Sequence, residues 1–336
     1  MAGEMYAVTG EALTDIANAI RSKTGDSAKL SLGEMADSIE GLRCGDDTET
    51  IAKLNAVIDR SIVEIRSDVE KIGSNAFRGC SQLTTADFPL ATSIGSYAFY
   101  NCLKLATIDF PIATSIDGNV FDSCSQLTTI DFPLAKSIGM YAFNGCSQLT
   151  TADFPAVTSI GTYAFNGCSQ LTTADFPLAT SIDGNAFDSC SQLTTIDFPV
   201  TKSIGTYAFN GCSQLTTIDF PMVTTIGNYA FRDCSQLTTA DFPIATYISR
   251  SAFYSCSKLN ALALRSQSLC SLSNSNAFSG TPISSGTGYI YVPSSLVDTY
   301  KSETNWSTYA TQFRALEDYT VDGTITGELD ADKIGA

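Results

Sequence analysis

The stretch Ile160–Ser181 reads I-G-T-Y-A-F-N-G-C-S-Q-L-T-T-A-D-F-P-L-A-T-S, and close variants of it recur along the middle of the chain. A cysteine occupies the same place in nine successive units, each 22 residues after the last: Cys80, Cys102, Cys124, Cys146, Cys168, Cys190, Cys212, Cys234 and Cys256. A short fixed period is typical of a solenoid, in which each unit contacts only its neighbours. We therefore expect function to lie on an extended surface.

One unit shows how the stack is built. In Cys102–Pro111, the residues Leu105, Ile108 and Phe110 have the spacing of a short strand that points its apolar side chains inward, while Asp109 faces solvent. The preceding Ala-Phe pair adds a second interior ring to each unit: Phe99, Phe121, Phe143, Phe165, Phe187, Phe209 and Phe231. The nine cysteines predict a column of buried free thiols, because stacked side chains run parallel rather than toward each other.

The motif A-F-x-x-C-x-x-L-x-x-[AI]-x-F-P resembles the BspA-like leucine-rich repeat family over roughly residues 61–264. This resemblance implies a curved, β-rich solenoid with short helical turns, and the family includes bacterial surface adhesins. We expect five segments: a helical anchoring module at 1–43, a helix and N-terminal cap at 44–71, the 22-residue units at 72–264, a divergent last repeat with an α/β cap at 265–317, and a hairpin and tail at 318–336.

Both ends of the chain carry a second resemblance. The words V-T-G-E-A-L-T-D-I-A-N-A-I-R at Val8–Arg21 and M-A-D-S-I-E-G-L at Met35–Leu42 resemble an N-terminal module of tail-associated structural proteins from phages of Gram-positive bacteria. The segment Tyr291–Ala310 resembles the closing segment of Gram-positive and phage repeat proteins. This resemblance implies attachment to a phage particle through the N-terminal module.

The closing segment also carries local structural signals. Trp306, Tyr309 and Phe313 recur at helical spacing, which predicts that they share one face of a helix in the cap. We expect Trp306 to belong to the core of that cap rather than to a ligand platform. Further on, Asp322-Gly323 between two β-prone triplets predicts a tight hairpin.

Composition excludes several classes of function. The 336 residues carry a formal charge of −16 with only 19 Lys plus Arg, which argues against nucleic-acid binding. The chain has no histidine, and it lacks phosphate-binding glycine loops, nucleophile elbows and zinc-spaced cysteine pairs. We expect no catalytic residue, cofactor or metal site. No stretch approaches the ~20 apolar residues of a membrane helix, and the first residues lack the regions of a secretory signal.

A set of tyrosines is the first candidate recognition surface. These residues precede the Ala-Phe pair and have Asn and Asp neighbours, which suits recognition of carbohydrate or protein by stacking and hydrogen bonding. Partial burial between successive turns is an equally open interpretation. The set comprises Tyr97, Tyr141, Tyr163, Tyr207 and Tyr229, with Tyr100 close by.

An acidic row is the second candidate surface. One strand position is aspartate in eight successive units: Asp87, Asp109, Asp131, Asp153, Asp175, Asp197, Asp219 and Asp241. Unit charges about 5 Å apart in water repel by somewhat under ~1 kcal/mol, which a stacked fold can absorb. We favour a solvated row that discourages aggregation, with a strip for divalent cations or a basic partner as the alternative.

Two sites flanking the Ala-Phe pair differ most between units, and we expect both to be exposed. The first site holds Ser96, Met140, Thr162, Asn228 and Arg250. The second site holds Arg78, Tyr100, Asp122, Asn144, Arg232 and Tyr254.

These features and resemblances together predict a non-enzymatic phage virion protein, a tail or baseplate adhesin made in the bacterial cytoplasm without a signal peptide. Its expected partners are other virion proteins, bound through residues 1–43, further copies of itself, and a glycan or protein of the host surface. The alternatives are an adhesin on a bacterial cell surface and a purely architectural spacer in the virion.

Overall fold

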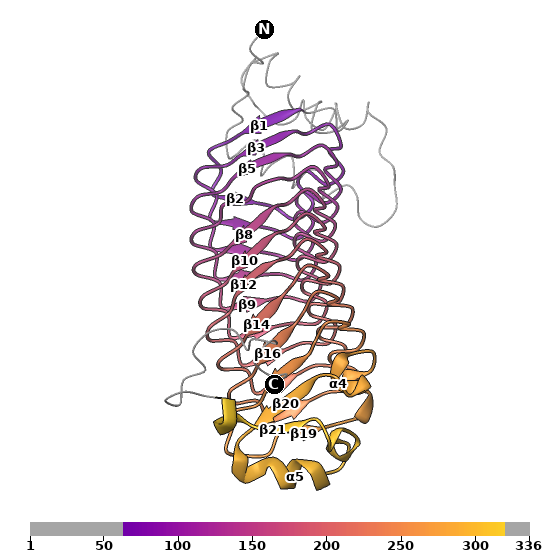
Figure 1. Ribbon diagram of the computed structural model, residues 1–336. Helices are drawn as coiled ribbons and strands as arrows, with labels where there is room; N and C mark the ends of the chain where they lie inside the picture. The colour runs from indigo at the N-terminus through magenta and orange to yellow at the C-terminus, as the bar shows by residue number, and fades with distance from the viewer. Residues whose placement is uncertain (1–62, 320–336) are drawn as a thin grey trace, which may run out of the picture.

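The computed structural model describes residues 63–319, which form a solenoid with its strands stacked along the long axis (Figure 1). A regular turn contains up to two strands. One is a long strand of three residues, which ends at the aspartate where one is present, and the other is a short strand of two residues, usually Ser-Ile. The long strands are β1 (Glu64–Arg66), β3 (Thr85–Asp87), β5 (Thr107–Asp109), β8 (Thr151–Asp153), β10 (Thr173–Asp175), β12 (Thr195–Asp197), β14 (Thr217–Asp219), β16 (Thr239–Asp241) and β18 (Ala261–Ala263). The short strands are β2 (Lys71–Ile72), β4 (Ser93–Ile94), β6 (Ser115–Ile116), β7 (Ser137–Ile138), β9 (Ser159–Ile160), β11 (Ser181–Ile182), β13 (Ser203–Ile204), β15 (Thr225–Ile226), β17 (Tyr247–Ile248) and β19 (Ser271–Leu272).

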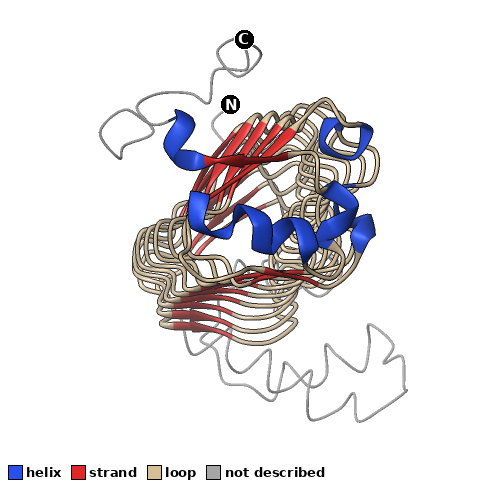
Figure 2. Ribbon diagram, turned by 60° about the horizontal axis from the view of Figure 1, so that its bottom comes forward, coloured by secondary structure: helices blue, strands red, loops and turns tan. Residues whose placement is uncertain are grey.

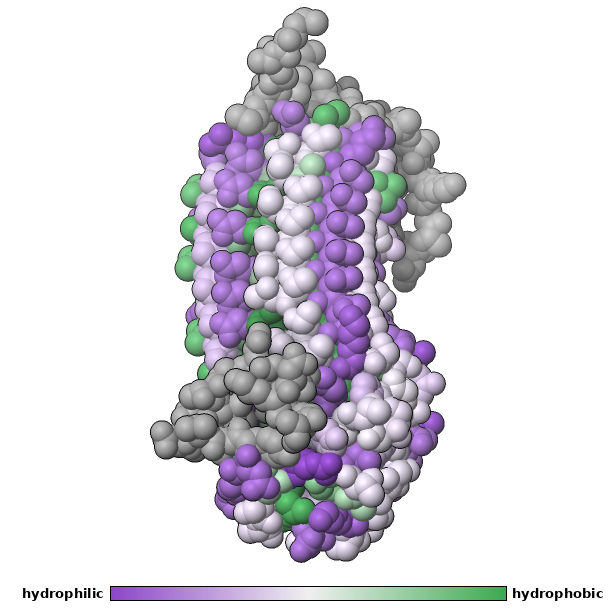
Figure 3. All heavy atoms as spheres, in the orientation of Figure 1, coloured by the Kyte–Doolittle hydropathy of each residue, from purple (hydrophilic) through white to green (hydrophobic). Residues whose placement is uncertain are grey.

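The long and short strands lie on different sides of the solenoid, with the core between them (Figure 2). Pairing is parallel, and each residue faces its equivalent one repeat away, as Thr173 faces Thr195. The fixed repeat therefore stacks like residues on like residues at the strand spacing of about 4.8 Å. Columns of similar hydropathy run along the surface as a result (Figure 3).

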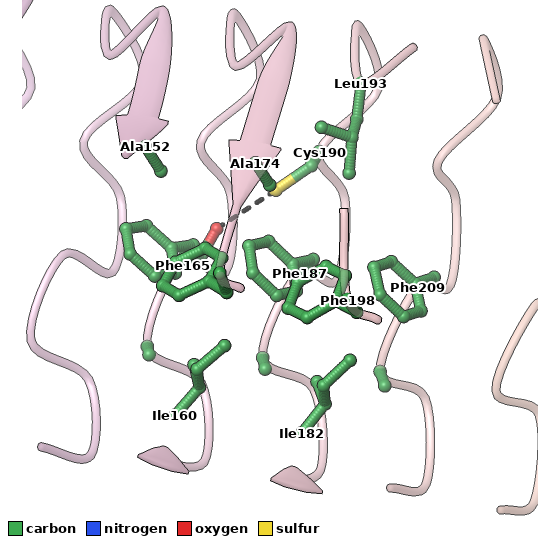
Figure 4. Close-up of a cluster of buried hydrophobic side chains, with 14 of the residues drawn as sticks. Ala152, Ile160, Phe165, Ala174, Ile182, Phe187, Cys190, Leu193, Phe198 and Phe209 are labelled. Atoms are coloured by element: carbon green, nitrogen blue, oxygen red, sulfur yellow. Dashed lines mark hydrogen bonds between the residues drawn. The ribbon is translucent and has the colours of Figure 1, made fainter. Parts of the chain in front are cut away.

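Phenylalanine fills the centre of every turn (Figure 4). Phe187 is fully buried and stacks on Phe165 and Phe209, with ring centroids 5.2 and 5.3 Å apart. The Phe198 ring, which follows the long strand, meets Phe187 edge-on at 5.8 Å. Two parallel phenylalanine columns thus interlock along the axis, and burial of this apolar surface is what stabilises the stack.

The cysteines form the predicted buried column, and none of the ten described cysteines is in a disulfide. Cys190 Sγ donates a hydrogen bond to the carbonyl oxygen of Phe165 in the neighbouring turn, at 3.2 Å (Figure 4). The same bond recurs along the column at Cys102, Cys124, Cys146, Cys168, Cys212, Cys234 and Cys256. Burial raises the pKa of six thiols of the column, which favours their unreactive protonated form: Cys124, Cys146, Cys168, Cys190, Cys212 and Cys234.

The two strand sets differ in continuity. The short strands form one unbroken sheet of ten, but the long strands are split into three sheets, with interruptions after β5 and after β12. Residues 129–131, equivalent to a long strand, form none. On the short-strand side the turns approach closely: a Cβ on Gly205 would lie 2.6 Å from the backbone of Asp183 and Gly184. A side chain at Gly205 would therefore force the two turns to shift, although the equivalent position holds Asp117, Asp183 and Ser249 in other turns.

The last turns extend the long-strand sheet with β20 (Tyr289–Val292) and β21 (Phe313–Ala315). Short helical segments complete this end: η1 (Ser275–Phe278), α4 (Pro282–Ser285), η2 (Ser294–Leu296), α5 (Val297–Ser302), η3 (Trp306–Tyr309) and η4 (Leu316–Tyr319).

The structure corrects the predicted helix in this cap. Trp306 is fully buried, as expected, and its Nε1 donates to the carbonyl of Cys270. However, Phe313 belongs to strand β21 rather than to a helix with Trp306 and Tyr309, because the chain leaves η3 to pair with β20. The expected anchoring module at 1–43, most of the cap at 44–71 and most of the segment at 318–336, including the hairpin, lie outside the described residues.

Candidate recognition surface

The tyrosine column occupies the turn that follows each short strand. Tyr97 is 37% exposed, and the other four members are half-buried. Two pairs stack face to face: Tyr141 on Tyr163 at 4.7 Å and Tyr207 on Tyr229 at 4.8 Å, each within 4° of parallel. The rings are therefore partly buried against one another and still reach solvent, and a role in recognition stays a prediction.

All five tyrosines adopt a left-handed backbone, with φ between 56° and 61°. The same position in other turns is Asn75, Asn119, Asn185 or Ser251, also at positive φ. Asparagine adopts this conformation readily, but a bulky residue there costs on the order of 1–2 kcal/mol. Five turns thus carry a tyrosine at a position whose backbone favours asparagine. Strain that persists at one position is a mark of functional sites.

Arginine flanks both ends of the tyrosine column. The guanidinium of Arg78 lies 5.4 Å from the ring centre of Tyr97 and 5.0 Å from that of Tyr100. Near the other end, Arg232 lies 5.9 Å from the ring of Tyr229 and 5.7 Å from that of Tyr254. Tyr100 therefore belongs to the same surface as the column, as the sequence predicted.

Asp122 is not exposed, which contradicts the prediction for the second variable site. Only 7% of it is accessible, because it accepts hydrogen bonds from Asn119 in its own turn and from Asn144 in the next turn, at 3.1 and 2.9 Å. Asp188 accepts the same pair of bonds three turns later, from Asn185 and Asn210. The D-G-N turns that interrupt the tyrosine column are thus linked to an aspartate that ties two turns together.

The aspartate row is on the surface, as predicted, and arginine occupies both of its ends. Arg66 lies 3.4 Å from Asp87, and Arg265 forms a two-point contact with Asp241. Between them, burial and the carboxylates of the neighbouring turns raise the pKa of Asp175. Among residues 63–319, no cluster of acidic or cysteine side chains is arranged to hold a metal ion.

An apolar column on the surface escaped the sequence reasoning. The residue after the proline is exposed by 36–50% in seven of the eight turns that have this proline, the exception being the smaller Ala156: Leu90, Ile112, Leu134, Leu178, Val200, Met222 and Ile244. The signal was present, because this position is always an apolar residue even though its identity changes from turn to turn. Large, aligned apolar surface is a mark of interaction sites.

A cleft between β12 and β14 also escaped the sequence reasoning. It has a volume of about 430 Å³ and is lined by residues of these two strands and by the prolines that follow them. Both turns keep the repeat motif, so the motif alone does not mark this place as hollow. The cleft lies where the long-strand ladder is interrupted.

Comparison with known proteins identifies the family. The BspA-type leucine-rich repeat model matches residues 59–172, 114–203 and 180–300, which together exceed half of the chain. No match to a curated protein sequence exists. Among residues 63–319, every helix is too short or too polar to span a lipid bilayer.

Three solved structures illustrate what the chain is similar to. A Treponema pallidum leucine-rich repeat protein is 26% identical over 46% of this chain and 78% of its own length, with a TM-score of 0.43. A leucine-rich cell-surface protein of Faecalibacterium prausnitzii is 24% identical (74% and 82% covered, TM-score 0.37), and the pneumococcal vaccine antigen PcpA is 17% identical (75% and 78%, TM-score 0.44). On the evidence of the family match, the chain belongs to the BspA-type leucine-rich repeat family and is a non-catalytic repeat protein.

Proposed function

We propose that this protein is a recognition module of a bacterial cell surface, and that its tyrosine column binds a glycan. The observation that carries the proposal is the strained backbone of all five tyrosines at a position where other turns use asparagine. Pairing of the short strands does not explain this choice, because β11, which precedes Asn185, pairs with both neighbouring strands in the regular register. A favourable interaction of the tyrosine rings has to offset the cost of the left-handed backbone.

The chemistry of the column suits a sugar chain. A tyrosine offers an apolar ring face and a hydroxyl, which matches a sugar ring with its C–H face and polar rim. The pairs Tyr141–Tyr163 and Tyr207–Tyr229 each form a flat aromatic stack, separated by the turn that carries Asn185. A linear ligand could therefore contact two aromatic stacks along one face, so modest affinities at each stack would combine.

The test replaces one stacked tyrosine pair with asparagine, the residue that other turns have at the equivalent position. The double variant Tyr141→Asn, Tyr163→Asn keeps a side chain that tolerates the left-handed backbone, so the fold should be retained. Binding of the labelled full-length protein to Gram-positive cells is measured before and after enzymatic removal of surface carbohydrate. We expect saturable binding that falls on removal of carbohydrate and is at least roughly tenfold weaker for the variant.

Tyr247→Asn is the matched control, because Tyr247 is 40% exposed but lies in β17, outside the column. It makes the same chemical change and should bind as the parent does. Equal loss in the control and the double variant, or no loss in either, would refute a role for the column. Binding that survives carbohydrate removal but is lost in the double variant would shift the ligand from glycan to protein.

The family supports the proposed cellular setting, since BspA-like proteins include bacterial surface adhesins. The virion adhesin predicted from the sequence depends on resemblances in residues 1–43, which lie outside the described residues, and in Tyr291–Ala310. The two settings differ in fractionation: a cell-surface protein stays with washed, phage-free cells, whereas a virion protein sediments with particles. Loss of particle incorporation on deletion of residues 1–60 would support the virion role and its proposed virion and self-association partners.

A further inference from the structure

The interruption after β12 is a local opening of an otherwise regular ladder. β10 pairs with β12, and β14 pairs with β16, but no pairing joins β12 to β14. The Thr194 N–H donates to Thr172 at 3.0 Å and the Thr238 N–H to Thr216 at 2.8 Å, whereas the equivalent bond from Thr216 to Thr194 is missing. The two turns therefore separate at their long strands.

The phenylalanine column behind the long strands widens at this opening. Phe176 and Phe198 are 5.3 Å apart between ring centres, whereas Phe198 and Phe220 are 6.1 Å apart, a spacing that Phe220 and Phe242 keep where β14 pairs with β16. On the far side of the same turns, Phe187 and Phe209 keep a spacing of 5.3 Å. The turns thus remain in contact through the other phenylalanine column and open only toward the aspartate row.

The residue in the middle of each long strand explains where the opening occurs. Ile196 and Ile218 stand in successive turns, while the paired strands on either side combine an isoleucine with an alanine, Ala174 with Ile196 and Ile218 with Ala240. Ile218 is 3% exposed, but Ile196 remains only partly buried. The interior accommodates one isoleucine between two turns, and a second one overfills it.

The interruption after β5 follows the same pattern. Ile108 and Ile130 stand in successive turns, the first of the two is again only partly buried, and no ladder joins β5 to the next turn. Two adjacent isoleucines thus coincide with an interrupted ladder at both places, and the interruption after β5 also includes the step from Ile130 to Ala152, where residues 129–131 do not pair with β8.

The opening after β12 produces the 430 Å³ cleft, which is within the volume range of small-ligand sites. Asp197 and Asp219 lie on its two walls, with Thr195 and Thr217 beside them. Its apolar lining comes from Ile196 and from the prolines that follow the two strands. A ligand here would meet two carboxylates, two hydroxyls and an apolar surface together.

Ion pairs elsewhere in the aspartate row indicate which side chain could pair with Asp197 and Asp219. At the ends of the row, the equivalent carboxylates of Asp87 and Asp241 contact the guanidinium groups of Arg66 and Arg265. The Arg265 contact uses two nitrogens on two oxygens, a geometry that arginine makes and lysine does not.

No ion pair among residues 63–319 involves Asp197 or Asp219. These two carboxylates share a cleft, and no cationic side chain of the described residues forms an ion pair with either of them.

We propose that the cleft between β12 and β14 receives an arginine side chain of a protein partner, with its guanidinium between Asp197 and Asp219. The threonine hydroxyls would accept from the remaining N–H groups, and the apolar lining would cover the aliphatic stem. This site is separate from the tyrosine column and does not depend on a glycan ligand there.

The experiment uses isotope-labelled full-length protein and the capped peptide Gly-Gly-Arg-Gly-Gly, with Lys and citrulline versions as probes. Titration is followed by shifts of the amide signals of Thr195 and Thr217. We expect the arginine peptide to bind at least roughly tenfold more tightly than the citrulline peptide, as the loss of a charge-assisted bond predicts. The lysine peptide should fall between them. Equal binding of all three peptides would refute the proposal.

Matched variants separate the cleft from general attraction to an acidic surface. Asp197→Asn with Asp219→Asn should abolish the preference for arginine, whereas Asp153→Asn with Asp175→Asn removes the same charge from the paired strands β8 and β10 and should leave it intact. Equal losses in the two double variants would mean that the peptide binds the charged row as a whole, and the proposal would fail.

A final variant keeps both carboxylates and closes the cleft. Ile196→Ala places an alanine beside Ile218, the combination found where ladders form, so β12 and β14 should pair. Slower hydrogen exchange of the Thr216 amide reports the closure, and binding of the arginine peptide should then disappear. Ile218→Ala provides the same test if the first variant stays open. Closure with undiminished binding would overturn the assignment.

Discussion

The two strand sets of one solenoid respond differently to the same repeat. The short strands stack without interruption because backbone meets backbone: a Cβ on Gly161 would lie 2.8 Å from the backbone of the turn before it. The long strands are separated by the side chain in their middle, which is alanine in some turns and isoleucine in others. Spacing limited by backbone contact is uniform, whereas spacing limited by side chains varies with the sequence and can open a binding site.

The largest expected effect compares how tightly the core is packed behind the long strands where neighbouring phenylalanine rings are closely spaced and where they are widely spaced. Phe176→Ala removes a ring that stacks at 5.3 Å on both sides, whereas Phe220→Ala removes one that stacks at 6.1 Å on both sides. Truncation of a buried phenylalanine costs about 3–5 kcal/mol. We expect Phe176→Ala at the upper end and Phe220→Ala at the lower end, measured by urea unfolding. A reversed order would mean that ring spacing does not report packing here.

The next effect concerns the short-strand side. Gly205→Ala places a methyl group 2.6 Å from the backbone of the neighbouring turn, and backbone cannot move aside as a side chain can. Overpacking costs typically 1–3 kcal/mol and occasionally more, and we expect this variant at the top of that range.

Gly118→Ala is the control for this variant, since its Cβ would meet only the Met140 carbonyl at 3.3 Å. It should cost much less in thermal unfolding. Similar melting temperatures for the two variants would show that close backbone contact does not set the turn spacing.

A third variant would turn a closed ladder into an open one. Ala174→Ile puts two isoleucines side by side with Ile196, so we expect the pairing of β10 with β12 to be lost at a cost of about 1–3 kcal/mol. Faster hydrogen exchange of the Thr194 amide, which now donates to Thr172, measures the opening. The control Thr173→Ile adds its bulk at the neighbouring, outward-facing position of the same strand. If the Thr194 amide exchanges no faster in Ala174→Ile, the inference that two adjacent isoleucines open the ladder would be refuted.

The smallest expected effect is electrostatic. Burial and the carboxylates of Asp197 and Asp153 raise the pKa of Asp175, so its protonated form is favoured in the folded state. The stability that this group contributes is therefore present below the ordinary aspartate pKa of about 3.9 and is lost as the pH rises through the raised value. Asp175→Asn should melt slightly higher than the parent near neutral pH, and the difference should vanish in acid and shrink in high salt. A lower melting temperature at neutral pH would contradict this sign.

The interior of the regular turns could be predicted from the sequence because nine near-copies repeat the same evidence. Phe165, Cys168 and Leu171 are buried wherever their equivalents occur, and a column of like residues has only one way to stack. The ladder interruptions could not be predicted in this way. Ala174 and Ile196 both count as apolar and inward-facing, and what matters is the sum of two neighbouring turns rather than either residue alone.

Other features also could not be predicted from the pattern within one repeat. Asp122 is buried because Asn144 of another turn supplies a donor, and no pattern within one unit contains that information. The short strands, such as β11, are two residues long and give no alternation of apolar and polar residues to detect. In the cap, Phe313 has the spacing of a helical neighbour of Trp306, but pairing with β20 decides its conformation. Local patterns predicted the repeat, whereas contacts between units decided the exceptions.

The link between Asp122 and Asn144, repeated three turns later between Asp188 and Asn210, has a consequence for how such a chain can change length. Loss or gain of one turn by recombination between near-identical coding units would leave an aspartate without its amide donor, or shift the gap in the tyrosine column. Loss or gain of three turns would keep this link and the spacing of the tyrosines. Allelic forms of this protein should therefore differ in size by whole groups of three repeats, with the spacing of the aromatic pairs preserved.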